Sequence, residues 1–218
     1  MSAGGSVRMK RSSDRRRYAR RKKLCRRLLM CTLTSLLVLI GVYFLSQYRL
    51  HMDYAKYPLK HKELIVSTAG EFGLEPWHVA AVVRCESGFW EGAVSSVGAR
   101  GLMQIMPETG EWLAGKFGEE DSFDEDDLFD PETNLKYGCW YLSWLMDRFD
   151  GDVTVVTAAF HAGQGKVDSW LEKPEYSPDG KTLSYIPFES TAKYVKNVLK
   201  ACEKYQKLYD FTEGAEAA

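Results

Sequence analysis

The sequence predicts a mainly helical domain preceded by one membrane-spanning helix. Apolar residues recur at helical spacing in several segments, most clearly over residues 135–149 and 190–209. No sustained alternation of apolar and polar residues indicates a large sheet. Residues 28–45 carry no charge and are long enough to cross a bilayer. With 218 residues, the chain has room for this anchor and one domain of ordinary size.

Stop signals and apolar spacing set the order of elements in the domain. They predict helices over 59–72, 76–86, 103–117, 131–149, 153–162 and 190–209, separated by loops over 88–101, 119–130 and 171–187. Pro76, Pro107 and Pro131 suit the first turns of their helices, whereas Gly73 and Gly151 suit stops. The second of these loops carries eight carboxylates and is expected to be a solvated surface stretch.

The N-terminal region is expected to stay on the cytoplasmic side of a membrane. Twelve Lys or Arg residues and one acidic residue lie between Arg8 and Arg27, directly before the apolar run. Positive flanks remain cytoplasmic, so we expect a retained signal-anchor helix over 28–46, with the later residues outside the cytoplasm. A cleaved secretory signal is the alternative. Its apolar core would be shorter, and residues 46–50 make a poor cleavage site.

Charge is unevenly distributed along the expected segments. These segments are a basic cytoplasmic stretch (1–27), a transmembrane helix (28–46), a polar tether (47–58), the main domain (59–210) and a frayed tail (211–218). Residues 28–218 hold 17 basic and 29 acidic residues, so their formal charge is near −12 (17 − 29). This acidity argues against nucleic acid as a partner. The basic run could bind nucleic acid, but its place beside the apolar span makes contact with anionic lipids the simpler account.

Cysteine and histidine residues indicate neither a metal site nor a cofactor. The four histidines are scattered, and no paired Cys or Asp stands near them at ligand spacing. Cys25 and Cys31 fall at the cytoplasmic edge of the span and inside it. Cys85, Cys139 and Cys202 remain outside the membrane. One disulfide with a free thiol and three reduced thiols both fit the sequence.

Glu86 is the leading candidate for a catalytic residue. It ends the helix predicted over 76–86, and helical spacing places it on one face with Val79, Val82 and Val83. Burial among these valines and the negative end of the helix dipole would both raise the pKa of its carboxyl group. A carboxylic acid that stays protonated near neutral pH can act as a general acid. The alternative is a glutamate at a frayed helix end that simply reaches water.

Four segments carry a resemblance to a known family. They are ESGF (86–89), GARGLMQIMP (98–107), AAFHAGQG (158–165), and IPF (186–188) followed by YV (194–195). In this order and spacing they resemble the catalytic domain of the soluble lytic transglycosylases, and the likeness covers about residues 59–209. DPETN (130–134), with YL (141–142) in the helix after it, also fits. The resemblance implies a lysozyme-like (goose-type) helical domain with at most a small β element.

The resemblance also implies a substrate and a mechanism. The substrate is the glycan of bacterial peptidoglycan, cut at the β-1,4 bond between N-acetylmuramic acid (MurNAc) and N-acetylglucosamine (GlcNAc). Glu86 protonates the glycosidic oxygen, and the substrate's own acetamido group stabilises the positive charge. The ionised glutamate then takes a proton from the muramic C6 hydroxyl, which closes on C1 as a 1,6-anhydro end. Most glycosidases use two carboxylates; no second acid stands in a matching motif here.

Further residues are implied to bind the glycan: Ser87, Gly101, Leu102, Met103, Gln104, Phe160, His161, Ala162, Gly163, Glu189 and Tyr194. Gln104 offers both a donor and an acceptor, as an acetamido or hydroxyl partner requires. The glycines of residues 98–101 would let a sugar approach the backbone closely. Met103 fits either the core or a sugar-stacking wall, and Tyr194 fits either the core or a hydroxyl that reaches the acid. Ser87 would cap the helix or hold the carboxylate.

Two departures from the family pattern affect the expected site. Where the family commonly reads Ala-Tyr-Asn-Ala-Gly, this chain has Phe160 and His161 in place of the tyrosine and the amide. Histidine can still donate or accept a hydrogen bond, but its charge depends on pH. Where the family has Glu-Thr-Arg after Ile-Pro-Phe, this chain has Ser-Thr-Ala, with Glu189 one position early. A contact supplied by that glutamate is therefore in doubt.

The leading hypothesis is thus a lytic transglycosylase in the bacterial cytoplasmic membrane, single-pass, with its catalytic domain facing the cell wall. One alternative is a muramidase, in which water rather than the C6 hydroxyl captures the intermediate. A second is a catalytically weak peptidoglycan-binding module. The presence of Glu86 and Gln104 argues against it, and the altered third and fourth motifs leave room for it.

Overall fold

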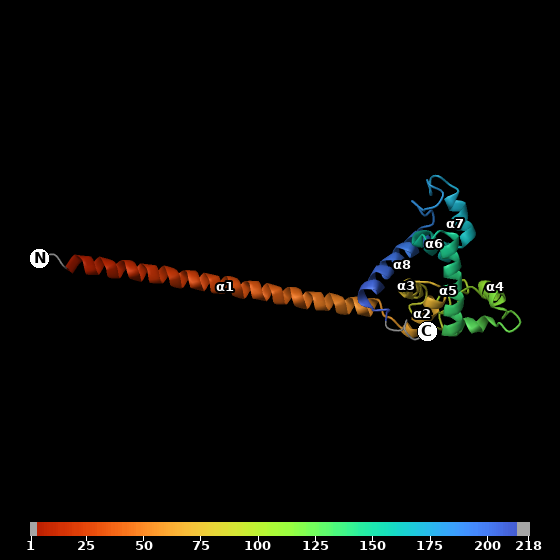
Figure 1. Cartoon of the computed structure of the whole chain (residues 1–218), viewed down its shortest axis with the longest axis horizontal. Helices are drawn as coiled ribbons and strands as arrows, with labels where there is room; N and C mark the ends of the chain where they lie inside the picture. Colours follow the sequence, from red (N-terminus) through yellow and green to blue (C-terminus); the bar gives the residue numbers. More distant parts are fainter. Residues whose placement is uncertain (1–3, 213–218) are drawn as a thin grey trace. The chain divides into compact units, whose positions relative to one another are not determined.

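The protein is described here by a computed structural model that covers residues 4–212, with side chains from residue 17 on. The chain separates into two units, the first ending at Met52 and the second beginning at Asp53. Helix α1 (Gly4–Lys56; Figure 1) contains the described residues of the first unit, and its residues 53–56 belong to the second. Parts of the predicted basic segment (1–3) and of the predicted tail (213–218) lie outside the described residues.

Helix α1 contains the stretch of the described chain that is long and apolar enough to cross a membrane. The large apolar side chains of residues 28–45 are exposed along this helix. Water would not favour so long a run of exposed apolar surface, whereas a bilayer would. The expected anchor over 28–46 therefore coincides with a helix of suitable length and composition.

The tether expected over residues 47–58 differs from the structure, because α1 remains helical as far as Lys56. Residues 47–57 contain no glycine or proline, so nothing in them stops the helix. The last turn is also held inside the second unit. Lys204 Nζ lies 2.6 Å from Asp53 Oδ2, and the Tyr54 hydroxyl donates to the Leu208 carbonyl at 2.8 Å. The polar composition of residues 47–56 therefore reflects an exposed helix face rather than a flexible linker.

The second unit is built from helices, which confirms the mainly helical fold predicted from the sequence. They are α2 (Lys62–Glu71), α3 (Pro76–Glu86), α4 (Pro107–Phe117), the 3₁₀ helix η1 (Glu125–Phe129), α5 (Pro131–Arg148), α6 (Val153–Ala162), α7 (Gln164–Leu171) and α8 (Glu189–Leu208). Extended pairing within residues 4–212 is limited to isolated bridges that join Arg100 to Val94 and to Ile105. These bridges are the small β element.

Three local features differ from the expected elements. Helix α4 begins at Pro107 rather than at residue 103, because Gln104 adopts a left-handed backbone (φ 52°) that no helix can include. The acidic loop contains η1, which is closed at its start by a capping box between Asp124 and Asp127. Gly163 (φ 87°) ends α6 and allows α7 to start directly afterwards in a new direction.

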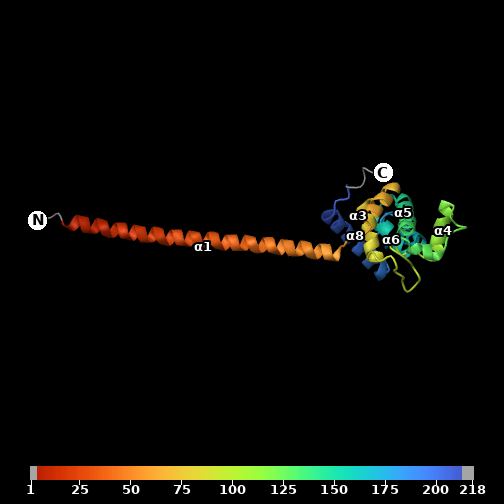
Figure 2. The ribbon, with the colours of Figure 1, turned by 90° about the horizontal axis from the view of Figure 1, so that it is seen from below.

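The core forms where α3 and α6 both pack against α8, with α2 and α5 beside them. Both views show α3, α6 and α8 side by side (Figures 1 and 2). Val79, Val83, Val156 and Val198 from these three helices have no exposed surface. Each buried apolar side chain of this size contributes about 1.5–3 kcal/mol relative to exposure. This packing sets the C-terminal ends of α3 and α6 against the N-terminal half of α8.

The three cysteines of the second unit are free thiols in the structure. Cys139 and Cys202 are buried, and Cys85 is partly buried. Burial raises the pKa of the Cys85 thiol to about 11 and that of the Cys202 thiol to about 12. All three therefore remain protonated near neutral pH and behave as small apolar side chains.

Candidate functional site

Glu86 is the last residue of α3, and its carboxyl group meets α8. The Tyr194 hydroxyl donates a hydrogen bond of 2.5 Å to Glu86 Oε1. Burial raises the pKa of Glu86 to about 7, and the hydrogen bond from Tyr194 opposes this rise because it favours the carboxylate. Near neutral pH, Glu86 is therefore poised between its acid and base forms, which is the range in which one group can serve both roles.

Tyr194 connects Glu86 to the C-terminal end of α6. Its side chain is 9% exposed, and its ring centroid lies 4.5 Å from that of His161. Burial and the neighbouring Glu86 hold the pKa of the Tyr194 phenol well above its usual value, so it remains a donor. Burial, with Lys166 nearby, lowers the pKa of His161, which keeps this imidazole neutral. His161 Nδ1 lies 3.2 Å from the Thr191 hydroxyl oxygen, which sets the plane of the ring.

Next to this chain of contacts lies a groove with a volume of about 230 Å³. Its walls are formed by Met103, Gln104, Ile105, Met106, Thr109, Leu113, Gly138, Tyr141, Phe160, His161, Ala162 and Gly163. The structure thus brings together six of the predicted binding residues: the pair 103–104 and the run 160–163. Tyr141 and Phe160, with ring centroids 5.7 Å apart, give the groove an aromatic side. No carboxylate is among these lining residues.

Ser87 ties the end of α3 to the loop that forms the groove. Its hydroxyl donates to the Leu102 carbonyl at 2.8 Å and accepts from the Phe89 amide at 3.2 Å. The side chain therefore supports the backbone around Glu86, and no hydrogen bond joins it to the carboxyl group among the described residues. Leu102 has no exposed surface and packs in the core. Of the two roles expected for Ser87, the structure shows the structural one.

Asn134 has a central role that the sequence analysis did not assign. It is fully buried, and its Oδ1 accepts from the Met103 amide at 2.7 Å. Its Nδ2 donates to the Arg100 carbonyl at 3.0 Å and to the Leu128 carbonyl at 2.7 Å. One amide side chain therefore holds the loop before Gln104 against α5 and η1. The signal for it was present, because Asn134 ends the DPETN segment that matched the family.

Gly101 is required by packing rather than by an approaching sugar. Its φ of 76° is left-handed, and a Cβ atom there would lie 2.0 Å from the Leu128 carbonyl oxygen. The Asn134 amide nitrogen would be 2.2 Å from the same atom. No other residue type fits between these groups. Packing therefore accounts for the glycine at this position, and its expected contact with substrate stays a prediction.

Met103 and Gln104 form the floor and one wall of the groove. Met103 has no exposed surface, and its sulfur lies against Gly138, where an added Cβ would approach it to 2.2 Å. This favours the core interpretation of Met103 over a sugar-stacking wall. Gln104 Nε2 donates to the carbonyls of Ala93 (3.1 Å) and Gly101 (2.9 Å). Its Oε1 is therefore the atom that remains to accept a hydrogen bond from a ligand.

Glu189 does not join the site. It is the exposed first residue of α8 and makes no side-chain hydrogen bond or ion pair within the described chain. Thr191, two residues later, is 2% exposed and faces His161. The first turn of α8 therefore turns the threonine inward and the glutamate outward. Glu189, which the resemblance implied as a glycan-binding residue, is therefore not among the residues that line the groove.

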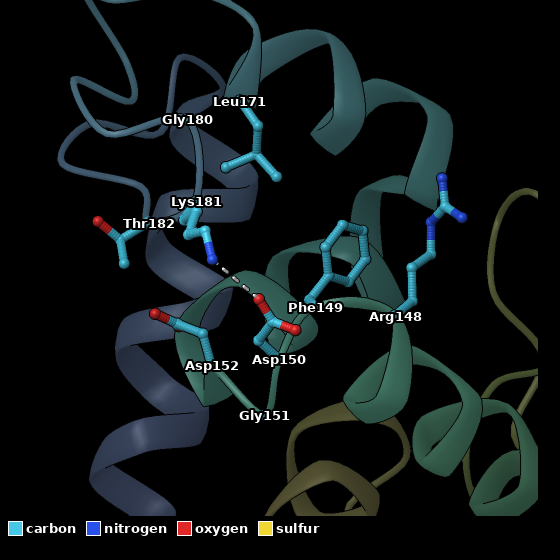
Figure 3. A pocket seen from close by; sticks show the side chains of 9 residues that line it. All are labelled: Arg148, Phe149, Asp150, Gly151, Asp152, Leu171, Gly180, Lys181 and Thr182. Atoms are coloured by element: carbon cyan, nitrogen blue, oxygen red, sulfur yellow. Dashed lines mark hydrogen bonds and ion pairs between the residues drawn. The ribbon is translucent and has the colours of Figure 1, made fainter.

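A larger cavity, of about 470 Å³, lies where α5 turns into α6. Figure 3 shows Lys181 reaching toward Asp150 across this cavity, at 3.5 Å. Arg148, at its edge, pairs with Asp168 at 2.8 Å. None of the predicted site residues lines it, and it lies at the opposite end of α6 from His161. Size therefore does not indicate the functional site in this protein. Within residues 4–212, no cluster of three metal-ligating side chains is found.

Residues 63–182 match the family model described as Transglycosylase SLT domain. The chain belongs to this family. It is 34% identical over 145 residues to the soluble lytic murein transglycosylases of Salmonella typhimurium and Escherichia coli, covering 66% of this chain and 22% of each relative. It is 31% identical over 162 residues to membrane-bound lytic murein transglycosylase C of Actinobacillus pleuropneumoniae, covering 65% of this chain and 44% of the relative. The chain thus spans about a fifth of the soluble relatives' length.

Solved structures show the same helical fold in this SLT chain. The 70 kDa soluble lytic transglycosylase of Escherichia coli superposes with a TM-score of 0.64 at 31% identity, over 71% of this chain and 25% of that protein. An inactive mutant of the lytic transglycosylase Slt from Pseudomonas aeruginosa gives a TM-score of 0.60 at 34% identity, over 70% of this chain and 25% of that protein. The lysozyme-like helical fold implied by the sequence motifs is confirmed.

Proposed function

We propose that this chain is a membrane-anchored peptidoglycan lytic transglycosylase that uses Glu86 as its catalytic acid and base. The observation that carries the proposal is a single carboxyl group with a pKa of about 7, which Tyr194 and His161 connect to a groove of about 230 Å³ in an SLT domain. The relatives named lytic murein transglycosylases support the reaction class. A protonated Glu86 donates its proton to the glycosidic oxygen, and the bond from that oxygen to C1 of MurNAc breaks.

No carboxylate lines the groove, so the groove offers Glu86 no partner acid. Glycosidases that use water or a covalent intermediate need a partner acid at a defined distance from the first. The nearby Glu91 is paired with His61 at 3.1 Å, and Glu189 faces solvent. The substrate's acetamido group would then stabilise the cation at C1. The ionised Glu86 takes the proton of the C6 hydroxyl, whose oxygen bonds to C1 and closes the 1,6-anhydro ring.

Four residues in the groove or beside it have roles in this scheme. The Tyr194 hydroxyl stabilises the carboxylate form of Glu86 between the two proton transfers. Gln104 Oε1 offers an acceptor for an acetamido N–H or a sugar hydroxyl. His161, held neutral, offers a ring nitrogen where the family commonly has an amide. Phe160 contributes its ring face but no hydroxyl.

The test uses the full-length protein in detergent and its Glu86→Gln variant. Both are incubated with purified peptidoglycan, and the products are analysed by mass spectrometry. We expect muropeptides lighter by one water, without a reducing end, from the wild type alone. Reducing muropeptides of full mass would instead identify a muramidase. If neither product formed while the protein still pelleted with peptidoglycan, the binding-module hypothesis would replace this one.

We also propose that α1 crosses the cytoplasmic membrane once, with the second unit outside the cytoplasm. The proposal rests on the apolar stretch in α1, on the twelve basic residues that precede it, and on the membrane-bound relative. Protease added to intact spheroplasts should digest the second unit and leave an N-terminal tag protected. Protection of the second unit with digestion of the tag would reverse the orientation.

A further inference from the structure

A third cavity, of about 270 Å³, lies between the C-terminal end of α3 and the middle of α8. Its lining residues are Lys56, Tyr57, Arg84, Cys85, Tyr194, Asn197, Lys200 and Ala201. Two of these residues adjoin the proposed acid: Cys85 precedes Glu86 in the chain, and Tyr194 donates a hydrogen bond to it. This basic cavity therefore shares a wall with the proposed catalytic centre.

The charge of the basic cavity is opposite to that of the domain around it. Lys56, Arg84 and Lys200 line it, and no carboxylate does. Within the described residues, none of the three side chains lies within 4 Å of an acidic group, although other cations of this unit form ion pairs. Three cations that have no acidic partner among the described residues lie around one concave surface and produce a local positive potential there. The formal charge of residues 28–218 is near −12.

The wall of the basic cavity is held in place by hydrogen bonds to three successive backbone carbonyls, those of residues 56–58. Arg84 Nε donates to the carbonyl of residue 56 at 3.0 Å. The Tyr209 hydroxyl donates to the carbonyl of residue 57 at 2.8 Å, and the Tyr205 hydroxyl donates to that of residue 58 at 2.7 Å. Arg84 uses only Nε for this purpose, which leaves its two terminal nitrogens for a ligand. A preformed site of this kind loses little conformational freedom on binding.

We propose that the basic cavity binds a carboxylate of the peptide stem carried by the MurNAc residue beside the bond that is cut. This inference rests on the proposed function. The stem is attached to MurNAc through its lactyl group, so its carboxylates are the anions that the substrate brings nearest to Glu86. The terminal nitrogens of Arg84 match a carboxylate in geometry, and Lys56 and Lys200 add charge. The Asn197 amide can donate a further hydrogen bond.

The consequence is a preference between two forms of the same polymer. Glycan that retains its peptide stems would occupy both the groove and the basic cavity, whereas glycan stripped of its stems would occupy the groove alone. The basic cavity would therefore direct the protein to peptide-bearing strands.

Binding of the full-length Glu86→Gln variant tests this preference without turnover. Its affinity is measured for intact peptidoglycan and for the same polymer after an amidase has removed the stems. Adding Lys56→Gln and Lys200→Gln together should weaken binding to intact polymer about fivefold, the scale of one to two partly exposed ion pairs. Binding to stripped polymer should not change. Lys196→Gln is the matched control, because it removes one charge from α8 outside the cavity.

Several results would overturn the inference. Equal weakening for both polymers would mean a general effect on the glycan or on the structure, and no weakening would leave the cavity without this role. Binding of the soluble lipid dihexanoyl phosphatidylglycerol tests whether a lipid headgroup occupies the basic cavity instead. If this soluble lipid bound in a manner that depended on Lys56 and Lys200 while the intact polymer did not, the occupant would be a lipid headgroup.

The proposed function and this inference fail in different ways. If the wild type cleaved neither polymer while the Glu86→Gln variant still preferred the intact one, only the catalytic proposal would fail. If the wild type formed anhydro products from both polymers and the variant bound both equally, only the inference about the basic cavity would fail.

Discussion

At the scale of single residues, the pKa of Glu86 depends on a tyrosine 108 positions later in the chain. Burial alone would favour the protonated acid, and the Tyr194 hydroxyl favours the carboxylate. The balance leaves the pKa of Glu86 near 7, in the range in which one group can both donate and accept a proton. Two substitutions, Tyr194→Phe and Glu86→Gln, separate the effect of the hydrogen bond from that of burial.

Tyr194→Phe removes the donor and keeps the ring. Because the hydrogen bond lowers the pKa of Glu86, its loss should shift the alkaline limb of kcat/KM about one unit upward. The measurement is the pH profile of peptidoglycan cleavage for the variant and the wild type. Tyr205→Phe serves as the control, since its hydroxyl binds the Pro58 carbonyl instead. An unshifted limb in Tyr194→Phe would argue that this bond does not set the pKa.

Glu86 should also make stability fall as pH rises. Its pKa is about 7 in the folded protein, against an ordinary value of 4.5, so the folded state binds the proton more tightly than the unfolded state does. The stabilisation is full below pH 4.5 and is lost as the pH rises through 7, a change of about 3 kcal/mol.

Glu86→Gln cannot ionise, so this variant should unfold at a higher temperature than the wild type at pH 8 and at a similar temperature at pH 4. Thermal unfolding of both proteins in one detergent is the measurement. Equal midpoints at pH 8 would contradict the raised pKa.

At the scale of elements, the groove depends on a loop that is held by buried backbone contacts. Residues 100–103 are fixed to α5 by Asn134 and to α3 by Ser87. Gly101 sits where this loop passes closest to η1. The loop has little regular structure, so these contacts decide where Gln104 points.

Two glycines in this loop form a matched pair for a test. Both have positive φ, 76° at Gly101 and 91° at Gly98, but only the first has neighbours within 4 Å of an added Cβ. Gly98→Ala should cost about 1 kcal/mol of stability from backbone strain alone. Gly101→Ala should cost about 3 kcal/mol or more, because the backbone of Leu128 must move.

Urea unfolding of the two variants measures this difference. We further expect Gly101→Ala to lower cleavage activity at temperatures where it remains folded, since Asn134 is displaced as well. Similar stability losses in both variants would mean that φ, rather than the close approach, governs this loop.

At the scale of the whole molecule, the proposed anchor would restrict where the protein acts. The twelve residues 47–58 span at most about 40 Å even when fully extended. If α1 crosses the membrane as proposed, the second unit acts on glycan close to the membrane surface. Replacing residues 1–46 by a cleavable export signal should leave cleavage in vitro intact and abolish complementation of a deletion strain. Full complementation by the released domain would show that anchoring is dispensable.

The sequence predicted the helices well where prolines and glycines mark their ends. Pro76 and Pro131 each begin the helix that they were expected to begin, and α4 begins at Pro107 although the apolar pattern placed its start at residue 103. The sequence predicted the ends of helices less well where no proline or glycine marked them and only the polarity of the residues was available. The expected tether is helical because no stop signal precedes Pro58, and the helix that follows Gly163 had no marked apolar stripe.

The sequence by itself determined the family, the helical class and the apolar stretch of α1, and it singled out Glu86 as the candidate acid, because motif order and periodicity are local properties of the chain. Only the tertiary structure decided what several of the other residues do. Met103 and Gly101 serve packing, Glu189 faces solvent, and Thr191 takes the inward position beside His161. These roles depend on which helix face meets which neighbour, and that is set by the joint packing of α3, α6 and α8 rather than by any one segment.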